Sequence, residues 1–393
     1  MKKTGRRCAA GLAALTLLIV LAAGRHILEG QGGFFPLTSH QEQETTISRE
    51  GFSMNTLISI SATGREEQAQ AALDDSLALI RHLDEELSLY RKESTLSGIN
   101  ARAGGEALAV SPDVFTAVAG AREMCRLTEG VFNPLIGPVT KLWKINRNPD
   151  DPETFTLPKQ ASLDAALVLT DPAGLELSPA GDGGGTVRLA RRGAMLDLGG
   201  IAKGYASTEI VKLLHARGMT SALVNLGGNV HVLGTKGGTP WNIGIRNPLT
   251  GDLGAALPPE LHSLAKTPVA LVLAAEDPER RGLALITSGG YERYRIVNGV
   301  RYSHFFDPRT GMPVQNDLLS ATVVSPDGAM ADALATTFMI MGSERAMEFI
   351  QSSAHPDLGA VLIRRSPEKG FEILATENLR GSVRRSLTEV RYF

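Results

Sequence analysis

The segment from Leu196 to Ala206 brings together the residue types that a phosphate-binding site needs. It reads LDLGGIAKGYA, with a carboxylate, Asp197, and an amine, Lys203, on either side of the pair Gly199-Gly200. We expect Asp197 to close an apolar strand, the glycines to let a ligand approach the backbone, and a helix to run over residues 202–215. Backbone N–H groups at a helix start favour an anion, so the segment predicts a phosphate site. The competing interpretation is an ordinary strand-to-helix connection whose glycines serve only the turn.

A carboxylate and a hydroxyl lie one helical turn apart in the segment Ala329 to Gly342, which reads AMADALATTFMIMG. Its composition predicts a helix, so Asp332 and Thr336, at i and i+4, share one face. Mg²⁺ takes oxygen ligands and keeps several waters, so these side chains and one backbone carbonyl are a sufficient site when a ligand phosphate completes it. Mn²⁺ accepts the same donors. The competing interpretation makes Asp332 a solvated helix residue.

A β-hairpin is predicted in the segment Ile286 to Pro313. The dipeptide Asn298-Gly299 stands between two short apolar-rich runs, 294–297 and 300–302, which is typical of a tight hairpin turn. His304 follows the hairpin. We expect it to be a structural hydrogen-bonding residue and assign it no catalytic role.

Six motifs in a fixed order resemble the ApbE family, the FAD:protein FMN transferases. Three are the segments just described. The others are Met54-Asn55-Thr56, residues 90–100 (YRKESTLSGIN) and residues 128–143 (TEGVFNPLIGPVTKLW). The resemblance runs from about Phe52 to about Gly342, which is most of the chain, and ordered, spaced motifs are far more specific than any one of them.

The resemblance implies a reaction. Members of the family bind FAD and, with Mg²⁺, move its FMN half onto a threonine or serine hydroxyl of a target protein, releasing AMP. The targets are exported or membrane redox proteins, such as subunits of quinone or ferredoxin oxidoreductases.

The resemblance also assigns site residues. By position, the FAD contacts are Met54, Tyr90, Val131, Phe132, Asn133, Asp197, Lys203 and Phe306. The metal ligands are the carbonyl oxygen of Gly200 and the side chains of Asp332 and Thr336. Tyr90 is the expected stacking partner of the isoalloxazine ring, since an aromatic face suits a planar ligand. Asp332 is the candidate catalytic residue, first as the anchor of the metal and second as an acceptor of the hydroxyl proton.

Two positions depart from the family pattern. Asn133 stands where many members have aspartate, and it keeps hydrogen bonding but removes a charge. Ala335 stands where some members carry an acid, so we expect one metal and not two. Two other functions stay open: an FAD pyrophosphatase, in which water replaces the protein hydroxyl, and a non-catalytic FAD-binding protein.

The N-terminus predicts export. Four basic residues precede an apolar run, 8–23, that is short for a membrane span, and small residues follow it. We therefore expect an export signal or retained anchor over residues 1–24, a linker over residues 25–46 and one flavin transferase domain over residues 47–393. The protein would be periplasmic or anchored to the outer side of the inner membrane. Arg25 stands where a lipidated cysteine is needed, so the protein is not expected to be a lipoprotein.

Composition and patterning predict the fold class. The 393 residues are 43% hydrophobic and carry a formal net charge of −2, which excludes a general nucleic-acid binder. Beyond the predicted signal, Cys125 is the only cysteine, so no internal disulfide can form; we expect it to be a small buried hydrophobe. Long helices at 66–89 and 112–127 beside scattered hairpins predict an α+β fold. The resemblance adds an ApbE-like, T-fold-like, two-lobed body with mixed or antiparallel sheets and packed helices.

Overall fold

The computed structural model describes residues 44–145, 155–255, 257–353, 355 and 357–393, and one compact unit spans Gln43 to Phe393. The predicted export segment and all but the last residues of the predicted linker lie outside the described part. The strands are β1 (Thr45–Ser53), β2 (Thr56–Gly64), β3 (Leu108–Val110), β4 (Leu175–Pro179), β5 (Gly185–Leu189), β6 (Ser221–Leu226), β7 (Asn229–Leu233), β8 (Trp241–Arg246), β9 (Val269–Ala275), β10 (Leu283–Gly289), β11 (Tyr294–Val297), β12 (Val300–Ser303), β13 (Leu318–Ser325), β14 (Gly359–Ser366), β15 (Gly370–Ala375), β16 (Val383–Ser386) and β17 (Val390–Tyr392).

The predicted helices form within two residues of their expected ends. The α-helices are α1 (Glu66–Leu87), α2 (Thr95–Ala101), α3 (Pro112–Leu127), α4 (Gly137–Trp143), α5 (Gln160–Leu167), α6 (Ala202–Ala216), α7 (Asp252–Ala255), α8 (Gly328–Met341) and α9 (Ser343–Ser352). Local signals explain two of the starts. Ser111 caps α3 by accepting a hydrogen bond from the N–H of Val114, and Asp327 caps α8 by accepting one from the N–H of Met330.

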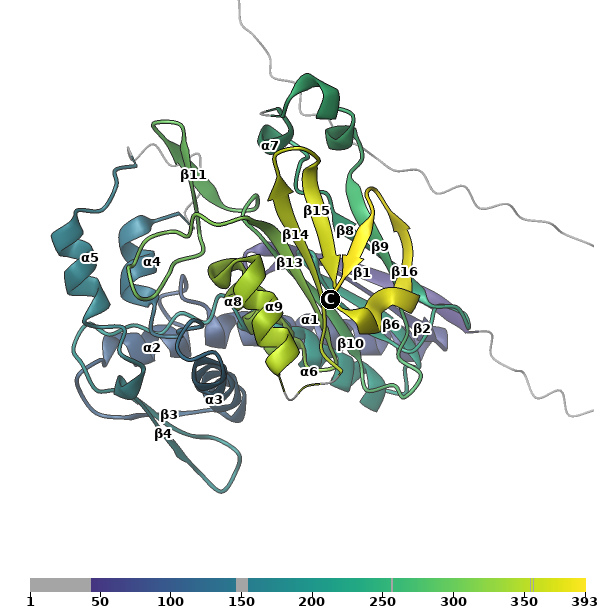
Figure 1. The fold of residues 1–393 in the computed structure, drawn as a ribbon. Coiled ribbons are helices and arrows are strands. Elements are labelled where there is room, and N and C mark those ends of the chain that lie inside the picture. The colour runs from purple at the N-terminus through teal and green to yellow at the C-terminus, as the bar shows by residue number, and fades with distance from the viewer. Residues whose placement is uncertain (1–43, 146–154, 256, 354, 356) are drawn as a thin grey trace, which may run out of the picture. The chain divides into compact units, whose positions relative to one another are not determined.

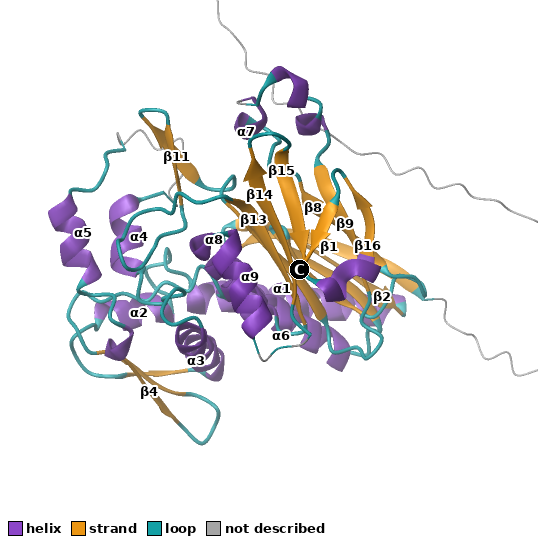
Figure 2. Cartoon of the chain, in the orientation of Figure 1, coloured by secondary structure: helices purple, strands orange, loops and turns teal. Residues whose placement is uncertain are grey.

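A nine-stranded sheet in the order β1-β2-β6-β7-β10-β13-β14-β15-β17 forms the centre of the unit (Figures 1 and 2). Neighbouring strands are antiparallel, except that β15 and β17 run parallel. All residues of β13 are buried, because α8 packs on one face of the sheet and a second sheet, β16-β9-β8, covers the other. Strands buried on both faces read as continuous apolar runs. The expectation of an α+β fold is confirmed.

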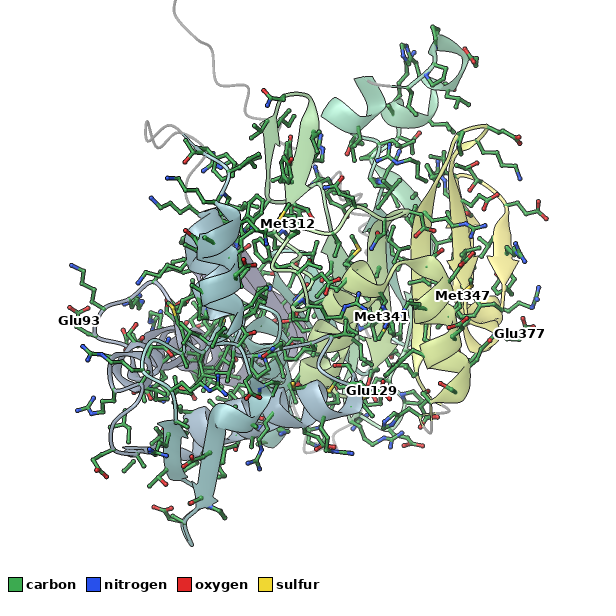
Figure 3. All side chains as sticks on the ribbon, turned by 60° about the vertical axis from the view of Figure 1, so that its left-hand side comes forward. Glu93, Glu129, Met312, Met341, Met347 and Glu377 are labelled. Atoms are coloured by element: carbon green, nitrogen blue, oxygen red, sulfur yellow. The ribbon has the colours of Figure 1, made fainter. Side chains whose placement is uncertain are left out.

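The main apolar core lies between the central sheet and the helices α1, α3, α6 and α8. It includes Leu73 of α1, Ile210 of α6 and Phe338 of α8, all with no measurable exposure. Met341 and Met347, labelled in Figure 3, pack against it from the end of α8 and from α9. This core fixes α6 and α8 against each other, and the candidate site lies on these two helices.

A smaller cluster of aromatic residues forms beside α4 and α5. The indole N–H of Trp143 donates to the carbonyl oxygen of Gly311 at 2.7 Å, and its ring lies 5.5 Å from that of Tyr302 and 6.1 Å from that of Phe306. The predicted hairpin is present as β11 and β12, and Tyr302 belongs to it. Figure 1 shows α4, α5 and β11 in the same part of the unit.

Cys125 is 5% exposed on α3, as expected for a small hydrophobe, and burial raises the pKa of its thiol to about 11. Within the described residues, no helix combines the length and the apolar character that crossing a bilayer requires.

Acid is expected to destabilise the fold through His231, a residue of β7 with 1% exposure. Burial lowers the pKa of His231 to about 4, and the nearby charge of Asp277 opposes this shift. The unfolded chain binds the proton near pH 6.5, so it holds more protons than the fold between pH 6.5 and 4, and stability falls as pH drops through that window. The total loss is about 3 kcal/mol, at 1.36 kcal/mol for each unit of pKa. Urea unfolding at pH 7, 6, 5 and 4.5 measures this loss. In a His231→Gln variant the free energy of unfolding should depend less on pH. The same pH dependence in both proteins would contradict the assignment to His231.

Candidate active site

Asp332 lies in the first turns of α8 and is 2% exposed, although it carries a carboxylate. Its Oδ2 accepts a hydrogen bond from the backbone N–H of Gly204 at 2.9 Å, and its Oδ1 accepts one from Asn229 Nδ2 at 3.2 Å. The ammonium of Lys203 lies 3.9 Å from Oδ2. These donors compensate the desolvation of a buried acid. The interpretation of Asp332 as a solvated helix residue is therefore wrong.

The N–H of Gly204 is free to bind Asp332 because of where α6 begins. Gly204 is the third residue of α6, so its N–H has no carbonyl acceptor inside the helix. The two helices also approach closely here. A Cβ on Gly204 would lie 2.0 Å from the carbonyl oxygen of Gly328, and one on Gly328 would lie 2.6 Å from the carbonyl oxygen of Gly204. Only glycine fits at either position, and this close crossing brings the carboxylate to the start of α6.

The other two predicted metal ligands lie together. Thr336 is partly exposed one turn after Asp332 on α8. A Cβ on Gly200 would lie 3.1 Å from Thr336 Oγ1 and 3.1 Å from the ring of Phe132. The close approach of the Gly200 backbone to Thr336 thus depends on the missing side chain. Among the described residues, no group of three or more histidine, cysteine, aspartate or glutamate side chains could hold a metal ion. The predicted donors are of a different kind, namely one carboxylate, one hydroxyl and one carbonyl.

Asp197 does not close a strand, so that expectation is wrong. The backbone N–H and C=O of Leu196 both bind the side-chain amide of Asn100, at 2.7 and 3.0 Å, where a strand would bind a neighbouring strand. The carboxylate of Asp197 accepts hydrogen bonds from the N–H of Gly199 at 2.9 Å and from the hydroxyl of Thr140 at 3.0 Å. Burial raises the pKa of Asp197, and these two hydrogen bonds oppose the shift.

Two basic side chains, Arg293 and Lys203, lie near Asp197 or His304. The charge of Arg293 also opposes the burial that raises the pKa of Asp197, and the same charge acts on His304. Nδ1 of His304 lies 3.1 Å from the carbonyl oxygen of Arg293. Burial lowers the pKa of His304 to about 4; the hydrogen bond opposes this, and the charges of Arg293 and Lys203 add to it. His304 is therefore a neutral hydrogen-bonding residue at pH 7, and Lys203 lies close enough to influence both His304 and Asp332.

The remaining predicted FAD contacts occupy different environments. Met54 has a positive φ of 50° at the tip of the β1–β2 hairpin, and Tyr90 is 58% exposed. Val131 and Phe132 are buried, at 9% and 4% exposure. Phe306, at 4%, packs on Trp143 in the aromatic cluster. For these three buried residues, contact with FAD stays a prediction from the resemblance.

Asn133 makes structural hydrogen bonds. Its Nδ2 donates to the carbonyl oxygen of Thr170 at 2.8 Å, and its Oδ1 accepts from the N–H of Leu135 at 2.9 Å. It also lines a pocket of about 980 Å³. Other residues of that pocket include Glu129, labelled in Figure 3, and Arg309. The amide of Asn133 thus connects its own loop with the segment around Thr170 at the edge of this pocket.

The sequence analysis missed residues that support the site. Asn229, Thr140, Asn100 and Arg293 bind or influence Asp332, Leu196 or Asp197, yet each is a common residue type far away in the chain. Three of these positions carried a signal: Asn100 and Thr140 lie inside the motifs 90–100 and 128–143, and Asn229 follows the glycine turn Gly227-Gly228 between two strands.

Comparisons with known proteins agree on one family. The model of the ApbE family matches residues 54–362. An FAD:protein FMN transferase of Treponema pallidum is 34% identical over 307 residues, which cover 75% of this chain and 78% of that protein. One of Klebsiella pneumoniae is 32% identical over 298 residues, covering 75% and 84%.

Solved structures show the same relationship. The flavin transferase ApbE from Vibrio cholerae superimposes with a TM-score of 0.71 and 26% identity, over 86% of this chain and all of that one. The ApbE protein of Thermotoga maritima, at 24% identity, has the same fold, with a TM-score of 0.71 over 87% of this chain. A family match over most of the chain, relatives above 30% identity and a shared fold together mean that this chain belongs to the ApbE family of flavin transferase enzymes.

Proposed function

We propose that this protein transfers FMN from FAD to a threonine or serine hydroxyl of an acceptor protein, with Mg²⁺, and releases AMP. The observation that carries the proposal is the carboxylate of Asp332, buried at 2% exposure and held by Gly204 and Asn229 beside Thr336 and Gly200. Curated relatives carry the name FAD:protein FMN transferase. The proposed acceptors are exported or membrane redox proteins.

The donor set suits a hard divalent cation. A carboxylate offers about four lone pairs. The hydrogen bonds from Gly204 and Asn229 use one lone pair on each oxygen of Asp332. Each oxygen therefore keeps one lone pair for a cation. Thr336 and the Gly200 carbonyl add neutral oxygens, and Mg²⁺ accepts such a mixed set with ligand phosphates. When bound, the ion neutralises charge that develops on the pyrophosphate.

The chain's own residues would bind and orient the reactants. Lys203 and Arg293 supply positive charge beside Asp197 and His304, which suits the phosphates of FAD. The acceptor hydroxyl attacks the phosphorus on the FMN side, and the bond to the bridging oxygen breaks. That oxygen leaves with AMP, and the hydroxyl proton passes to a base. Asp332 is the candidate base, and its first role is to anchor the cation.

The proposed location follows from the N-terminus. Residues 1–24 carry the pattern of an export signal or anchor, so we place the enzyme outside the cytoplasm, periplasmic or held at the outer side of the inner membrane. Fractionation of cells into cytoplasm, periplasm and membrane, followed by immunodetection of the chain, measures this; recovery in the cytoplasm alone contradicts it.

The test of the function uses the purified protein with FAD, Mg²⁺ and an acceptor domain that carries a Ser/Thr-containing flavinylation motif. We expect in-gel flavin fluorescence on the acceptor, an acceptor mass increased by FMN, and AMP in equal amount. Free FMN and AMP without an adduct would show hydrolysis, and FAD that stays intact in Mg²⁺ would show a binding protein. Either result overturns the proposal, provided that the same acceptor is flavinylated by a known flavin transferase.

A further inference from the structure

We infer that Asn229 is a positioning residue that sets the orientation of the Asp332 carboxylate for the cation. The inference rests on the proposed function, because it concerns the metal of that reaction. Asn229 is 3% exposed at the first position of β7, and its amide nitrogen donates to Asp332 Oδ1 at 3.2 Å. It has no assigned contact with FAD.

Two donors on opposite oxygens fix a carboxylate more firmly than one. Gly204 holds Oδ2 from the start of α6, and Asn229 holds Oδ1 from the central sheet. A single donor would leave Asp332 free to turn about χ2, a broad and soft torsion. With both donors in place, the orientation of the carboxylate plane is fixed before a cation binds. The hydrogen bonds also determine which lone pair of each oxygen remains available to the cation.

The sheet position of Asn229 is itself fixed. The turn between β6 and β7 consists of Gly227 and Gly228, with φ of 64° and 95°, which favour glycine. The N–H of Gly228 donates to Asn225 Oδ1 at 2.8 Å, and the N–H of Gly227 donates to the carbonyl oxygen of Leu57 at 3.0 Å. A Cβ on Gly227 would lie 2.0 Å from Thr56 Oγ1, so the turn sits directly against the β1–β2 hairpin.

This arrangement links two parts of the site. Met54, a predicted flavin contact, lies at the tip of the β1–β2 hairpin, and that hairpin carries the turn that precedes Asn229. Asn229 in turn holds the predicted metal carboxylate. Backbone contacts of the turn therefore set the distance between Met54, on the predicted flavin side, and Asp332, on the predicted metal side. The side chain of Asn229 makes the last contact, to Asp332 on α8.

The experiment compares Asn229→Ala with Asn225→Ala in the full-length protein with FAD bound. Each variant removes one side-chain hydrogen bond at the β6–β7 connection: Asn225→Ala removes the acceptor for the Gly228 N–H within the turn, and Asn229→Ala removes the donor to Asp332. Mn²⁺ affinity is measured by electron paramagnetic resonance and Mg²⁺ affinity by competition against Mn²⁺. Transfer rates are recorded over a range of Mg²⁺, with FAD affinity and melting temperature alongside.

Asn229→Ala is expected to weaken metal binding about 10- to 100-fold, as loss of a group that orients a metal ligand does. Excess Mg²⁺ should restore transfer to within about threefold of the parent rate, a recovery that misfolding would not give. Asn225→Ala keeps the donor to Asp332 and removes only a hydrogen bond of the turn, so it should weaken metal binding far less than Asn229→Ala does. Unchanged metal binding in Asn229→Ala, or an equal loss in both variants, overturns the inference. A parent protein that binds metal but transfers no FMN overturns only the proposed function; a parent that binds no metal overturns both.

Discussion

Replacing Asp332 with asparagine is expected to reduce metal-dependent FMN transfer at least about 1,000-fold. Asparagine keeps the shape of the side chain: its oxygen accepts from the Gly204 N–H, and its NH2 faces Asn229, whose amide must flip to present its own oxygen as acceptor. It removes the only carboxylate of the proposed donor set. Loss of about 4 kcal/mol of charge stabilisation in the transition state corresponds to that factor. Single-turnover transfer to the acceptor, followed by mass, measures it.

Asp327→Asn is the matched control, because Asp327 lies just before the same helix. Its carboxylate accepts a hydrogen bond from the N–H of Met330 at 3.1 Å, and asparagine caps a helix equally well. This variant loses the same charge without touching the proposed ligands, so transfer should be unchanged. If Asp332→Asn kept more than a tenth of the parent rate at the same Mg²⁺ concentration, the role of Asp332 as metal anchor would be wrong.

Alanine at position 204 is expected to cost about 3 kcal/mol of stability, the upper end for an overpacked core, and to weaken metal binding. The added methyl would lie 2.0 Å from the carbonyl oxygen of Gly328 and 2.7 Å from Cβ of Asp332. Because the first contact is with backbone, α6 and α8 must separate, and the Gly204 N–H then moves away from the carboxylate. The melting temperature should fall by about 4 °C, because the unfolding entropy of a unit of this size is about 0.7 kcal/mol/K.

Gly120→Ala provides the comparison. Gly120 lies within α3, where a Cβ would meet only the side chain of Ile201, at 3.9 Å. Alanine is the better helix former by about 1 kcal/mol, so this variant should be as stable as the parent or more stable. Differential scanning calorimetry of the two variants separates the helix-crossing effect from the general effect of alanine in a helix. Equal melting temperatures for the two variants would show that the crossing is not as tight as the structure has it.

Local patterns of the sequence predicted local structure well. The spacing of apolar residues predicted α1 and α6, and composition predicted α8, nearly at their observed ends; the helix expected at 112–127 is α3, and Asn298-Gly299 marked the turn between β11 and β12. Each of these signals lies within one turn of a helix or one hairpin. The periodicities of helix and strand are properties of neighbouring residues, so a single sequence is sufficient to detect them.

Contacts between distant segments were not predictable in this way. Asp197 was expected to end a strand because apolar residues precede it, but the amide of Asn100, 96 residues before Leu196, binds the backbone there instead. Asn229 and Asp332 are 103 residues apart. No periodicity records such a pairing. Helical spacing placed Asp332 and Thr336 on one face, but only the family resemblance added Gly200 to the proposed site.

The small size of the aromatic cluster around Trp143 has a consequence for local unfolding. Among the described residues its buried members number 6, two of them aromatic, against 53 in the main core, so less apolar area from these residues holds α4 and α5 in place than holds α8. Segments with fewer buried contacts open at lower free energy and exchange their amide hydrogens sooner. Phe306 belongs to this cluster, and a ligand that contacts it would slow exchange in α4 and α5 while leaving α8 unchanged. Hydrogen exchange measured with and without FAD would therefore distinguish a ligand that reaches Phe306 from one that binds only beside Asp332.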